Sequence, residues 1–180
     1  MDFQPVLESD YVLLRALQNV DLEPLYQVAK DPMIWEQHPC QRNLRPEFEK
    51  FFLESIDSQG ALTIIDKKSN AIIGSSRYKP ILGLSNGVEI GWTFLSRNYW
   101  GGKYNKEIKN LMIEHAFKFV ENIVFYIDIN NIRSQRAVEK LNGRKLEGSD
   151  TRKFSSTNSD VVTYVLRNNK GSVEIEKAKS

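Results

Sequence analysis

A strand, a glycine pair and a long amphipathic helix follow one another between residues 87 and 117, and this succession constrains the fold more than any other feature of the sequence. Residues 88–95 alternate well enough between apolar and polar side chains to form a strand. Gly101 and Gly102 come next, and without a Cβ atom the backbone can turn sharply there. Apolar side chains recur at helical spacing over 104–120, namely Ile108, Leu111, Met112, Ala116 and Phe119. The segment therefore predicts a helix that packs one face on a sheet.

The segments on either side complete a mixed pattern of strands and helices. Strands are expected at 11–17, 61–65, 71–78, 123–129, 144–147 and 161–166, and helices at 21–30, 46–56 and 131–141. Asp21 is the expected N-cap of the first helix, with Pro24 in its first turn. The polar run DKKSN predicts a hairpin, and the meander continues through Gly83 and Asn86-Gly87. This order favours a mixed α/β sheet with helices on both faces.

Size and charge narrow the class of protein. The chain has 180 residues, of which 41% are hydrophobic, so residues 1–167 are expected to form a single domain before a polar tail at 168–180. The net charge is +2, and the basic residues do not form blocks. Nucleic acid is therefore not an expected partner.

Cysteine usage and hydropathy bear on the compartment. Cys40 is the only cysteine, which excludes an intramolecular disulfide and zinc sites built on several thiolates. No run approaches about 18 apolar residues, and the first residues lack a basic segment followed by a long apolar one. We therefore expect a cytoplasmic protein without a membrane partner.

The glycine loop suggests an anion site. Several backbone N–H groups can point to one place there, beside the positive end of the helix dipole, which suits a pyrophosphate. Arg97 and Lys103 flank the loop and could add positive charge. An ordinary tight turn between a strand and a helix is the alternative for the glycine pair alone.

Three motifs occur in a recognisable order. They are Glu89-Ile90-Gly91-Trp92, Trp100-Gly101-Gly102-Lys103-Tyr104 and Asn131-Ile132-Arg133-Ser134, the last in a helix that ends at Lys140-Leu141. Together they resemble the GNAT acetyltransferases, in particular the Rim-type group that includes ribosomal-protein N-terminal acetylases. The resemblance covers residues 7–167. It implies a mostly antiparallel sheet, with a V-shaped splay between the fourth and fifth strands and helices on both faces.

The resemblance also implies where acetyl-coenzyme A would bind as cosubstrate, without a metal. The loop from Trp100 to Asn105 would hold the pyrophosphate, and the pantetheine arm would lie along the fourth strand, where a β-bulge frees N–H groups. Asn131 and Ser134 would face the pantetheine and the sulfur. The expected cofactor-binding residues are Thr93, Phe94, Leu95, Arg97, Trp100, Gly101, Gly102, Lys103, Tyr104, Asn105, Asn131 and Ser134.

The chain departs from the family pattern at positions that matter for chemistry. Lys103 stands where Gly or Ala is usual, so its side chain must point away from the phosphate cradle or contact phosphate. Val138 stands where some relatives place a tyrosine general acid, so the leaving thiolate needs another proton donor or solvent. Residues 130–153 hold seven basic and three acidic residues, which suits a phosphorylated adenosine or a solvated helix face.

These features predict an acetyl-CoA-dependent N-acetyltransferase, in which a primary amine attacks the thioester directly. Glu89 is the candidate catalytic base, because its neighbours Val88 and Ile90 point to the opposite face of the strand. A structural glutamate is the alternative role. The alternative function is a non-catalytic acyl-CoA-binding or regulatory module, while nucleotide binding is disfavoured because WGGK matches neither glycine-rich nucleotide motif.

The expected acceptor is a primary amine, on a small molecule or at a protein N-terminus. Residues 31–57 hold six acidic and three basic residues, which favours a cationic amine such as a polyamine or a protein tail. His38 and Cys40 are interpreted as part of a loop that lines the acceptor cleft, and His115 as a buried packing residue. The oligomeric state stays open, with a homodimer as one alternative.

Overall fold

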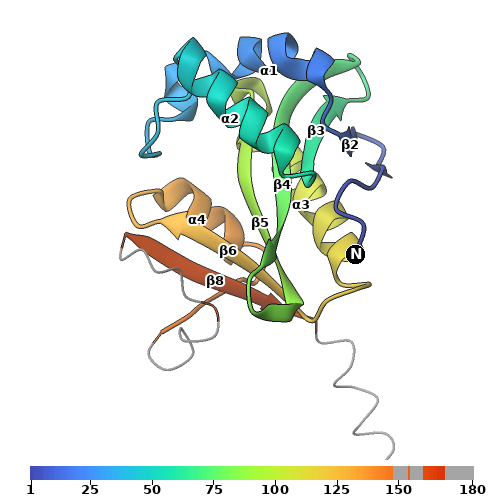
Figure 1. Cartoon of the computed structure of the whole chain (residues 1–180), viewed down its shortest axis with the longest axis vertical. Helices are drawn as coiled ribbons and strands as arrows, with labels where there is room; N and C mark the ends of the chain where they lie inside the picture. The colour runs from blue at the N-terminus through green and yellow to red at the C-terminus, as the bar shows by residue number, and fades with distance from the viewer. Residues whose placement is uncertain (148–153, 155–159, 169–180) are drawn as a thin grey trace, which may run out of the picture.

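The fold is built on one twisted sheet (Figure 1). The computed structural model describes residues 1–147, 154 and 160–168, and within them eight strands pair in the order β1-β2-β3-β4-β5-β6-β8-β7. The strands are β1 (Leu7–Glu8), β2 (Val12–Ala16), β3 (Ala61–Asp66), β4 (Ala71–Ile81), β5 (Leu84–Leu95), β6 (Asn122–Asp128), β7 (Arg144–Lys145) and β8 (Val161–Arg167). The predicted hairpin is confirmed as β3 and β4.

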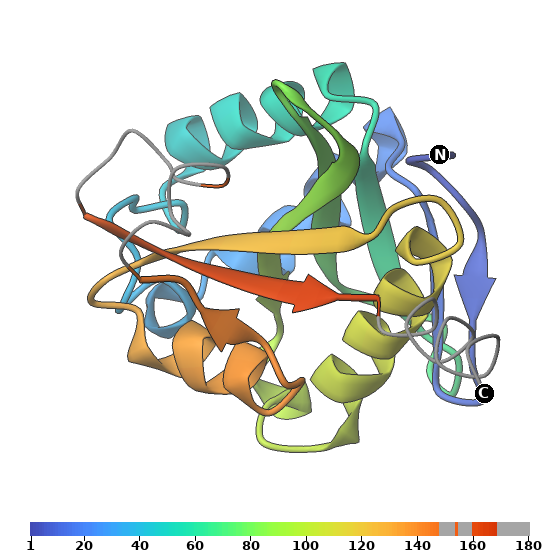
Figure 2. The same ribbon diagram turned by 90° about the horizontal axis from the view of Figure 1, so that it is seen from below.

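Helices cover both faces of this sheet, as the sequence predicts. The α-helices are α1 (Leu22–Ala29), α2 (Arg45–Asp57), α3 (Lys103–Ala116) and α4 (Ile132–Glu139), and short 3-10 turns cover Asn19–Asp21, Pro32–Ile34 and Arg97–Tyr99. Figure 2 shows α2 on one side of the sheet and α3 and α4 on the other. Each face of the sheet carries its own buried hydrophobic cluster. Leu25 and Phe48 pack from α1 and α2, whereas Ile108, Met112 and Val138 pack from α3 and α4.

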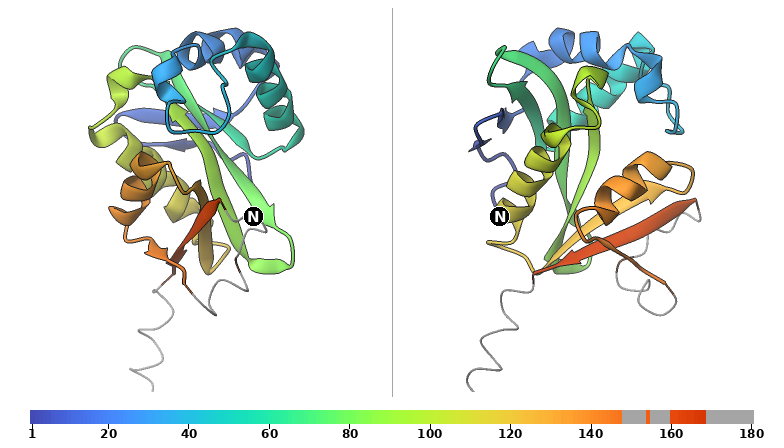
Figure 3. Two further views of the ribbon diagram at one scale, coloured as in Figure 1. Left: turned by 90° about the vertical axis from the view of Figure 1, so that its left-hand side faces the viewer. Right: turned by 180° about the vertical axis from the view of Figure 1, so that it is seen from behind.

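The sheet opens into a V between β5 and β6. These strands are parallel and pair only from Gly87 with Asn122 to Glu89 with Val124. Beyond Glu89 they diverge, and the right-hand view of Figure 3 shows the opening above their shared end. Because β1 is a short additional strand at the edge, the predicted fourth and fifth strands correspond to β5 and β6. The predicted mixed, mostly antiparallel GNAT fold with its splay is confirmed.

A β-bulge interrupts β5 where it begins to leave β6. Ser75 pairs with Phe94 and Arg77 with Gly91, so β5 has one extra residue between these two pairs. Trp92 takes up the irregularity with a φ of 52°, a left-handed conformation that is rare for a bulky residue. A bulge of this kind interrupts the regular ladder and re-aims neighbouring side chains.

Several predicted boundaries differ from the structure. The helix predicted over 104–120 ends at Ala116, so Phe119 lies outside it and is 53% exposed. Asn86-Gly87 belongs to β5, and the chain instead turns at Gly83, whose φ of 79° suits glycine.

The prediction of Asp21 as the N-cap residue of the first helix is confirmed in position, although its side chain makes no capping bond to α1. Asp21 directly precedes α1, but its carboxylate accepts two 2.7 Å hydrogen bonds from Arg15 and one from Thr63, and does not cap α1. The residue therefore ties the helix start to the sheet.

The predicted tail, 168–180, begins one residue too early. Asn168 bonds through its backbone N–H to Glu121 and through its side chain to Phe117, both at 2.9 Å. It therefore belongs to the domain, whereas the rest of the predicted tail, 169–180, lies outside the described residues.

Candidate functional site

The glycine loop meets α3 in a backbone conformation that exposes N–H groups. Gly101 has a φ of 69°, and a Cβ atom added there would meet no other atom within 4 Å. Gly102 is the N-cap residue of α3 and makes no side-chain cap. The first N–H groups of a helix have no partner within it, so Lys103, Tyr104 and Asn105 present free donors at its positive end. An open, donor-rich cradle of this kind fits a pyrophosphate.

The side chains around this loop have structural partners. The Lys103 ammonium lies 3.1 Å from the centroid of the Tyr11 ring, so it points away from the cradle. The Tyr104 hydroxyl donates a 2.9 Å hydrogen bond to Asp66, which anchors the start of α3 to β3. Arg97 donates to Asp31 at 2.5 Å. Binding at the loop would therefore rest on backbone N–H groups.

Trp100 links the loop to α4 on the other side of the V. Its indole N–H donates to the Leu95 carbonyl at 2.9 Å, and the Arg133 guanidinium lies 4.1 Å from the ring centroid. Arg133 also donates to the carbonyl of Ile34. The sequence analysis missed this role of Arg133, because its partners are distant in sequence and no local pattern links them.

The predicted pantetheine segment of β5 divides between the two faces of the sheet. Phe94 packs with Trp35, Phe48 and Phe51, whereas Leu95 packs in the cluster around α3, so both side chains belong to the core. Beyond Glu89 the edge of β5 that faces β6 has no strand partner. Unpaired backbone groups on such an edge can bond an extended, amide-containing arm.

Asn131 and Ser134 lie at the start of α4. The Asn131 side-chain oxygen accepts a 3.0 Å hydrogen bond from the Ser134 backbone N–H, so Asn131 is the N-cap of this helix and is 9% exposed. The Asn131 side-chain oxygen is therefore already engaged in the helix cap. The Ser134 hydroxyl stays half-buried.

Glu89 occupies the last residue pair before β5 and β6 diverge. Val88 and Ile90 pack in the cluster around α3, so the Glu89 side chain lies on the opposite face, half-buried. Burial raises the pKa of its carboxyl to about 7, against the opposing attraction of Lys79 and Arg77. No hydrogen bond of the described residues satisfies this carboxylate, so it is available to accept a proton near neutral pH.

A buried lysine was missed by the sequence analysis. Lys109 of α3 is 6% exposed, and its ammonium donates to the Thr93 hydroxyl at 2.5 Å and to Ser76 at 3.3 Å. Burial lowers its pKa to about 7. The available signal was its position beside Ile108 and three residues before Met112, on the buried stripe of the helix.

Two arginines face aromatic rings on the Glu89 side of the sheet. The guanidinium of Arg42 lies 4.2 Å from the Phe51 centroid, and that of Arg77 lies 4.6 Å from Trp92 and 5.6 Å from Phe51. Arg77 is 6% exposed and donates to Ser55, while its Nε has no partner. The cluster is therefore cationic, although residues 31–57 are acidic as a whole.

The contacts of the two histidines and the cysteine are those of structural residues. His115 is 8% exposed and its Nε2 lies 2.8 Å from the Asp2 carbonyl oxygen, as expected of a packing residue. Burial and the nearby Arg42 lower the pKa of His38 to about 4, so it is neutral at pH 7. The Nδ1 of His38 accepts from the backbone N–H of Cys40, whose thiol is exposed. The two side chains do not form a nucleophile–base pair.

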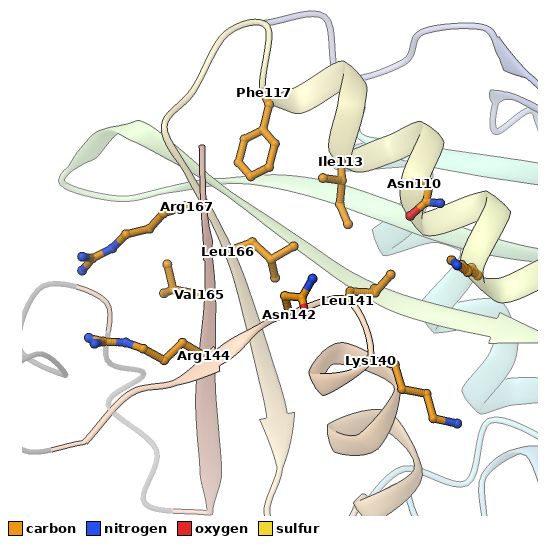
Figure 4. A pocket seen from close by; sticks show the side chains of 11 residues that line it. Asn110, Ile113, Phe117, Lys140, Leu141, Asn142, Arg144, Val165, Leu166 and Arg167 are labelled. Carbon is orange, nitrogen blue, oxygen red and sulfur yellow. The ribbon is translucent and has the colours of Figure 1, made fainter. Parts of the chain in front are cut away.

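A cavity of about 580 Å³ lies between α3, the end of α4 and β8 (Figure 4). Its walls include the cationic residues Lys106, Lys140, Arg144 and Arg167 and the apolar residues Ile113, Phe117, Leu141, Val165 and Leu166. Two basic residues of the region 130–153, Lys140 and Arg144, thus line this cavity. None of the predicted cofactor-binding residues lies in its wall.

In residues 1–147, 154 and 160–168, no group of three or more His, Cys, Asp or Glu side chains could hold a metal ion. No helix in these ranges is long and apolar enough to cross a membrane.

Comparisons with known proteins agree with this geometry. The family model described as an acetyltransferase (GNAT) domain matches residues 12–144. No curated protein sequence matches the chain. Among solved structures, an acetyltransferase (GNAT family) from Bacillus anthracis is 18% identical, with a TM-score of 0.72 over 91% of this chain and 98% of that one. A probable acetyltransferase (GNAT family) from Chromobacterium violaceum is 16% identical, with a TM-score of 0.77 over 94% and 89%.

A third solved structure carries a more specific name. It is a putative ribosomal-protein-serine acetyltransferase from Vibrio cholerae, 14% identical, with a TM-score of 0.70 over 93% of this chain and all of that one. At such identities these likenesses support the fold alone. The family model covers most of the chain, and the chain therefore belongs to the GNAT acetyltransferase family.

Proposed function

We propose that this acetyltransferase is acetyl-CoA-dependent and moves the acetyl group to a primary amine by direct attack on the thioester. The observation that carries the proposal is the position of Glu89, a desolvated carboxylate at the closed end of the V. A general base is most effective when its pKa lies near the working pH, and about 7 meets that condition. Glu89 would accept the proton of the incoming ammonium directly or through one water.

Acetyl-CoA would bind across the open part of the V. Its pyrophosphate would meet the loop from Trp100 to Asn105, where Gly101 leaves space and the start of α3 supplies donors. Its pantetheine arm would run along residues 93–95 of β5, with Asn131 and Ser134 on the α4 side. Neutral amine then attacks the thioester carbonyl, a C–N bond forms, and the C–S bond breaks.

The finer assignments follow from the motifs. We place the chain in the Rim-type group on its Glu-x-Gly-aromatic, Trp-Gly-x-x-Tyr and Asn-x-x-Ser motifs, as one domain over 1–168 that acts in the cytoplasm. A non-catalytic acyl-CoA-binding module is the second candidate, because Val138 stands at the position of the family tyrosine. Turnover separates the two.

The test measures thiol release from acetyl-CoA across a panel of amines, with wild type and Glu89→Gln. The variant should keep the thermal stabilisation by acetyl-CoA and lose about 10²-fold or more in turnover at neutral pH, with partial recovery as free amine becomes abundant at higher pH. Glu54→Gln is the matched control, because this exposed carboxylate also acts on Arg77. Near-normal turnover of Glu89→Gln would assign Glu89 a scaffolding role, and stabilisation without turnover on any amine would favour the binding module.

A further inference from the structure

The ammonium of Lys109 lies between the diverging parts of β5 and β6. It donates to Thr93 at the bulge of β5, and it lies 5.8 Å from the ring centroid of Phe125 on β6. Both residues come after the last β5–β6 pair, which is Glu89 with Val124. The charged end of Lys109 therefore points into the V, beside the segment where the pantetheine arm is proposed to run.

Burial of the Lys109 ammonium destabilises the folded state, so a functional role would explain a lysine at this position. Burying an ammonium costs several kcal/mol when no opposite charge compensates it. The groups that face Lys109 from β4, β5 and β6 are the Ser76 and Thr93 hydroxyls and the Phe125 ring, and no carboxylate of the described residues pairs with it. Leucine or methionine would fill the same volume on the buried face of α3 at lower cost.

The reaction lacks a proton donor at the position where some family members have one. Val138 of α4 is 5% exposed and packs in the same cluster as Ile108 and Met112, so it offers no acidic proton. On the basis of the proposed acetyl transfer, we propose that Lys109 is a catalytic residue that donates a proton to the sulfur of departing coenzyme A.

The proton balance of this step closes within the site. The incoming ammonium gives its first proton to Glu89, which passes it to solvent. The neutral amine then forms the C–N bond and gives its second proton to Glu89, and the electron pair of the broken C–S bond stays on sulfur. The Lys109 ammonium transfers a proton to that thiolate, which leaves a neutral lysine and a thiol. Solvent then returns a proton to Lys109 and removes one from Glu89, so the net products are the amide, coenzyme A and one proton released to solvent.

The titration of Lys109 suits this role. Its pKa is lowered to about 7 by burial alone, with no charged group of the described residues contributing. An acid with a pKa near the working pH gives up its proton more readily than an exposed lysine and still holds it for much of the time. Ser76 and Thr93, whose hydroxyl oxygens lie 2.7 Å apart, hold the ammonium in place.

Turnover of Lys109→Met is the first test. This change keeps the length and apolar packing of the side chain, and removes the proton. We expect turnover to fall by about 10²-fold with little change in the affinity for acetyl-CoA, because general acid catalysis contributes about 10²- to 10⁴-fold. Lys106→Met is the control, because Lys106 lies on the same helix but is exposed, and it should turn over normally.

The affinity for coenzyme A relative to desulfo-coenzyme A is the second test, and it needs no turnover. Beside an ammonium the bound thiol ionises more easily, so wild type should prefer coenzyme A increasingly as pH rises from 6 to about 7, above which Lys109 itself loses its proton and the preference should level off. Lys109→Met should lose that preference and bind desulfo-coenzyme A as wild type does. If the variant does not fold, the wild-type measurement decides alone.

Two results would overturn the role of Lys109. One is turnover of Lys109→Met within about threefold of wild type, and the other is a wild-type preference for coenzyme A that does not change with pH. Failure of the proposed function has a different signature, since wild type would then release no thiol with any amine.

The arginine pair beside Phe51 carries a second, independent inference. Arg42 and Arg77 face the same ring, and burial together with the nearby Arg42 lowers the pKa of Arg77 to about 10, against the opposing attraction of Glu54 and Glu89. In the part of the chain that the structure describes, neither forms an ion pair with a carboxylate. The Arg77 Nε is also buried without an acceptor. Like charges held together in this way favour an anion between them.

We infer that the acceptor amine carries an anionic group, a carboxylate or a phosphate, that binds Arg42 and Arg77. Arg77 pairs with Gly91, two residues after Glu89 on the same strand, so an amine attached to that anion would lie near the candidate base. Trp92 and Phe51 would cover the apolar part of the acceptor. This inference rests on the proposed function and replaces the preference for a cationic amine drawn from residues 31–57.

Matched acceptors test the arginine pair. An amino acid such as phenylalanine is compared with its amide and with phenethylamine, and an aminoalkyl phosphate with the corresponding amino alcohol. We expect the anionic member of one series to have at least a tenfold higher kcat/KM, and Arg42→Gln to remove that advantage through KM. The control is Arg45→Gln, whose guanidinium is already paired with Glu23 and Glu49.

A binding assay separates this inference from turnover. N-acetylphenylalanine, the product of one arm, should stabilise wild type and not Arg42→Gln in thermal unfolding, even if the proposed chemistry fails. Equal kcat/KM for the acid and its amide, and for the phosphate and its alcohol, would overturn the assignment. An equal loss of kcat/KM for the anionic and the uncharged acceptor in Arg42→Gln would also overturn it.

Discussion

The desolvation of Glu89 makes a quantitative prediction about stability. Its pKa is raised from 4.5 to about 7, chiefly by burial. At about 1.36 kcal/mol per pKa unit, ionised Glu89 costs the folded state about 3 kcal/mol relative to the protonated acid. A raised pKa favours the folded state fully below the unfolded value, and this advantage is lost as pH rises through the folded value.

Glu89→Gln resembles the protonated acid at every pH, so it removes this dependence. Its free energy of unfolding should match that of wild type at pH 4 and exceed it by up to about 3 kcal/mol at pH 9. The assay is urea unfolding of both proteins at pH values across that range, with Glu54→Gln as the exposed control. A difference between the two proteins that stays constant with pH would refute the reasoning, because it would mean that Glu89 is solvated.

Three further predictions follow from named contacts. Gly101→Val should lower stability by about 1 to 2 kcal/mol, because its φ of 69° is left-handed, and should abolish thermal stabilisation by acetyl-CoA, whereas Gly102→Ala, at a φ of −111°, should fold normally. Asp21→Asn should cost about 3 kcal/mol in urea unfolding at pH 7, because it breaks the buried pair with Arg15. Burial opposes ionisation of Asp21, but hydrogen bonds from Arg15 and Thr63 outweigh it and lower its pKa, so the difference from wild type should shrink only below pH 3.8. Lys103→Ala should bind acetyl-CoA normally in a thermal-shift assay, because its ammonium contacts Tyr11 and only its backbone N–H faces the cradle.

Local patterns predicted most of the fold. The strands and helices of the middle of the chain follow from periodicity and turn residues, because each depends on neighbours in sequence. At two places tertiary contacts decide what a local signal leaves open. Asn86-Gly87 has the composition of a turn, yet Gly87 pairs with Asn122 inside β5. Asp21 has the position of an N-cap, yet Arg15 and Thr63 hold its carboxylate.

The sequence predicted those parts of the candidate site that lie within a contiguous motif. The glycine loop and Glu89 stand in contiguous motifs, and their backbone roles depend on residues next to them. Lys109 and the Arg42–Arg77 pair could not be found this way, because their partners come from other elements of the fold. Net charge over 31–57 favours a cationic amine, whereas our inference from Arg42 and Arg77 favours an anionic one, because net charge takes no account of burial. It counts exposed helix residues such as Glu47 and Asp57 equally with Arg42, which packs on Phe51.

The splay between β5 and β6 divides the sheet into two parts that share few backbone pairs. Strands β1 to β5 form one plate and β6, β8 and β7 another, and within the sheet the plates share only the pairs from Gly87–Asn122 to Glu89–Val124. An arm that bonds both free edges would join the plates as a missing strand would. Glu89 lies in the last of the shared pairs. In the proposed reaction, proton transfer would therefore take place where the plates are joined, and ligands would enter and leave where they separate.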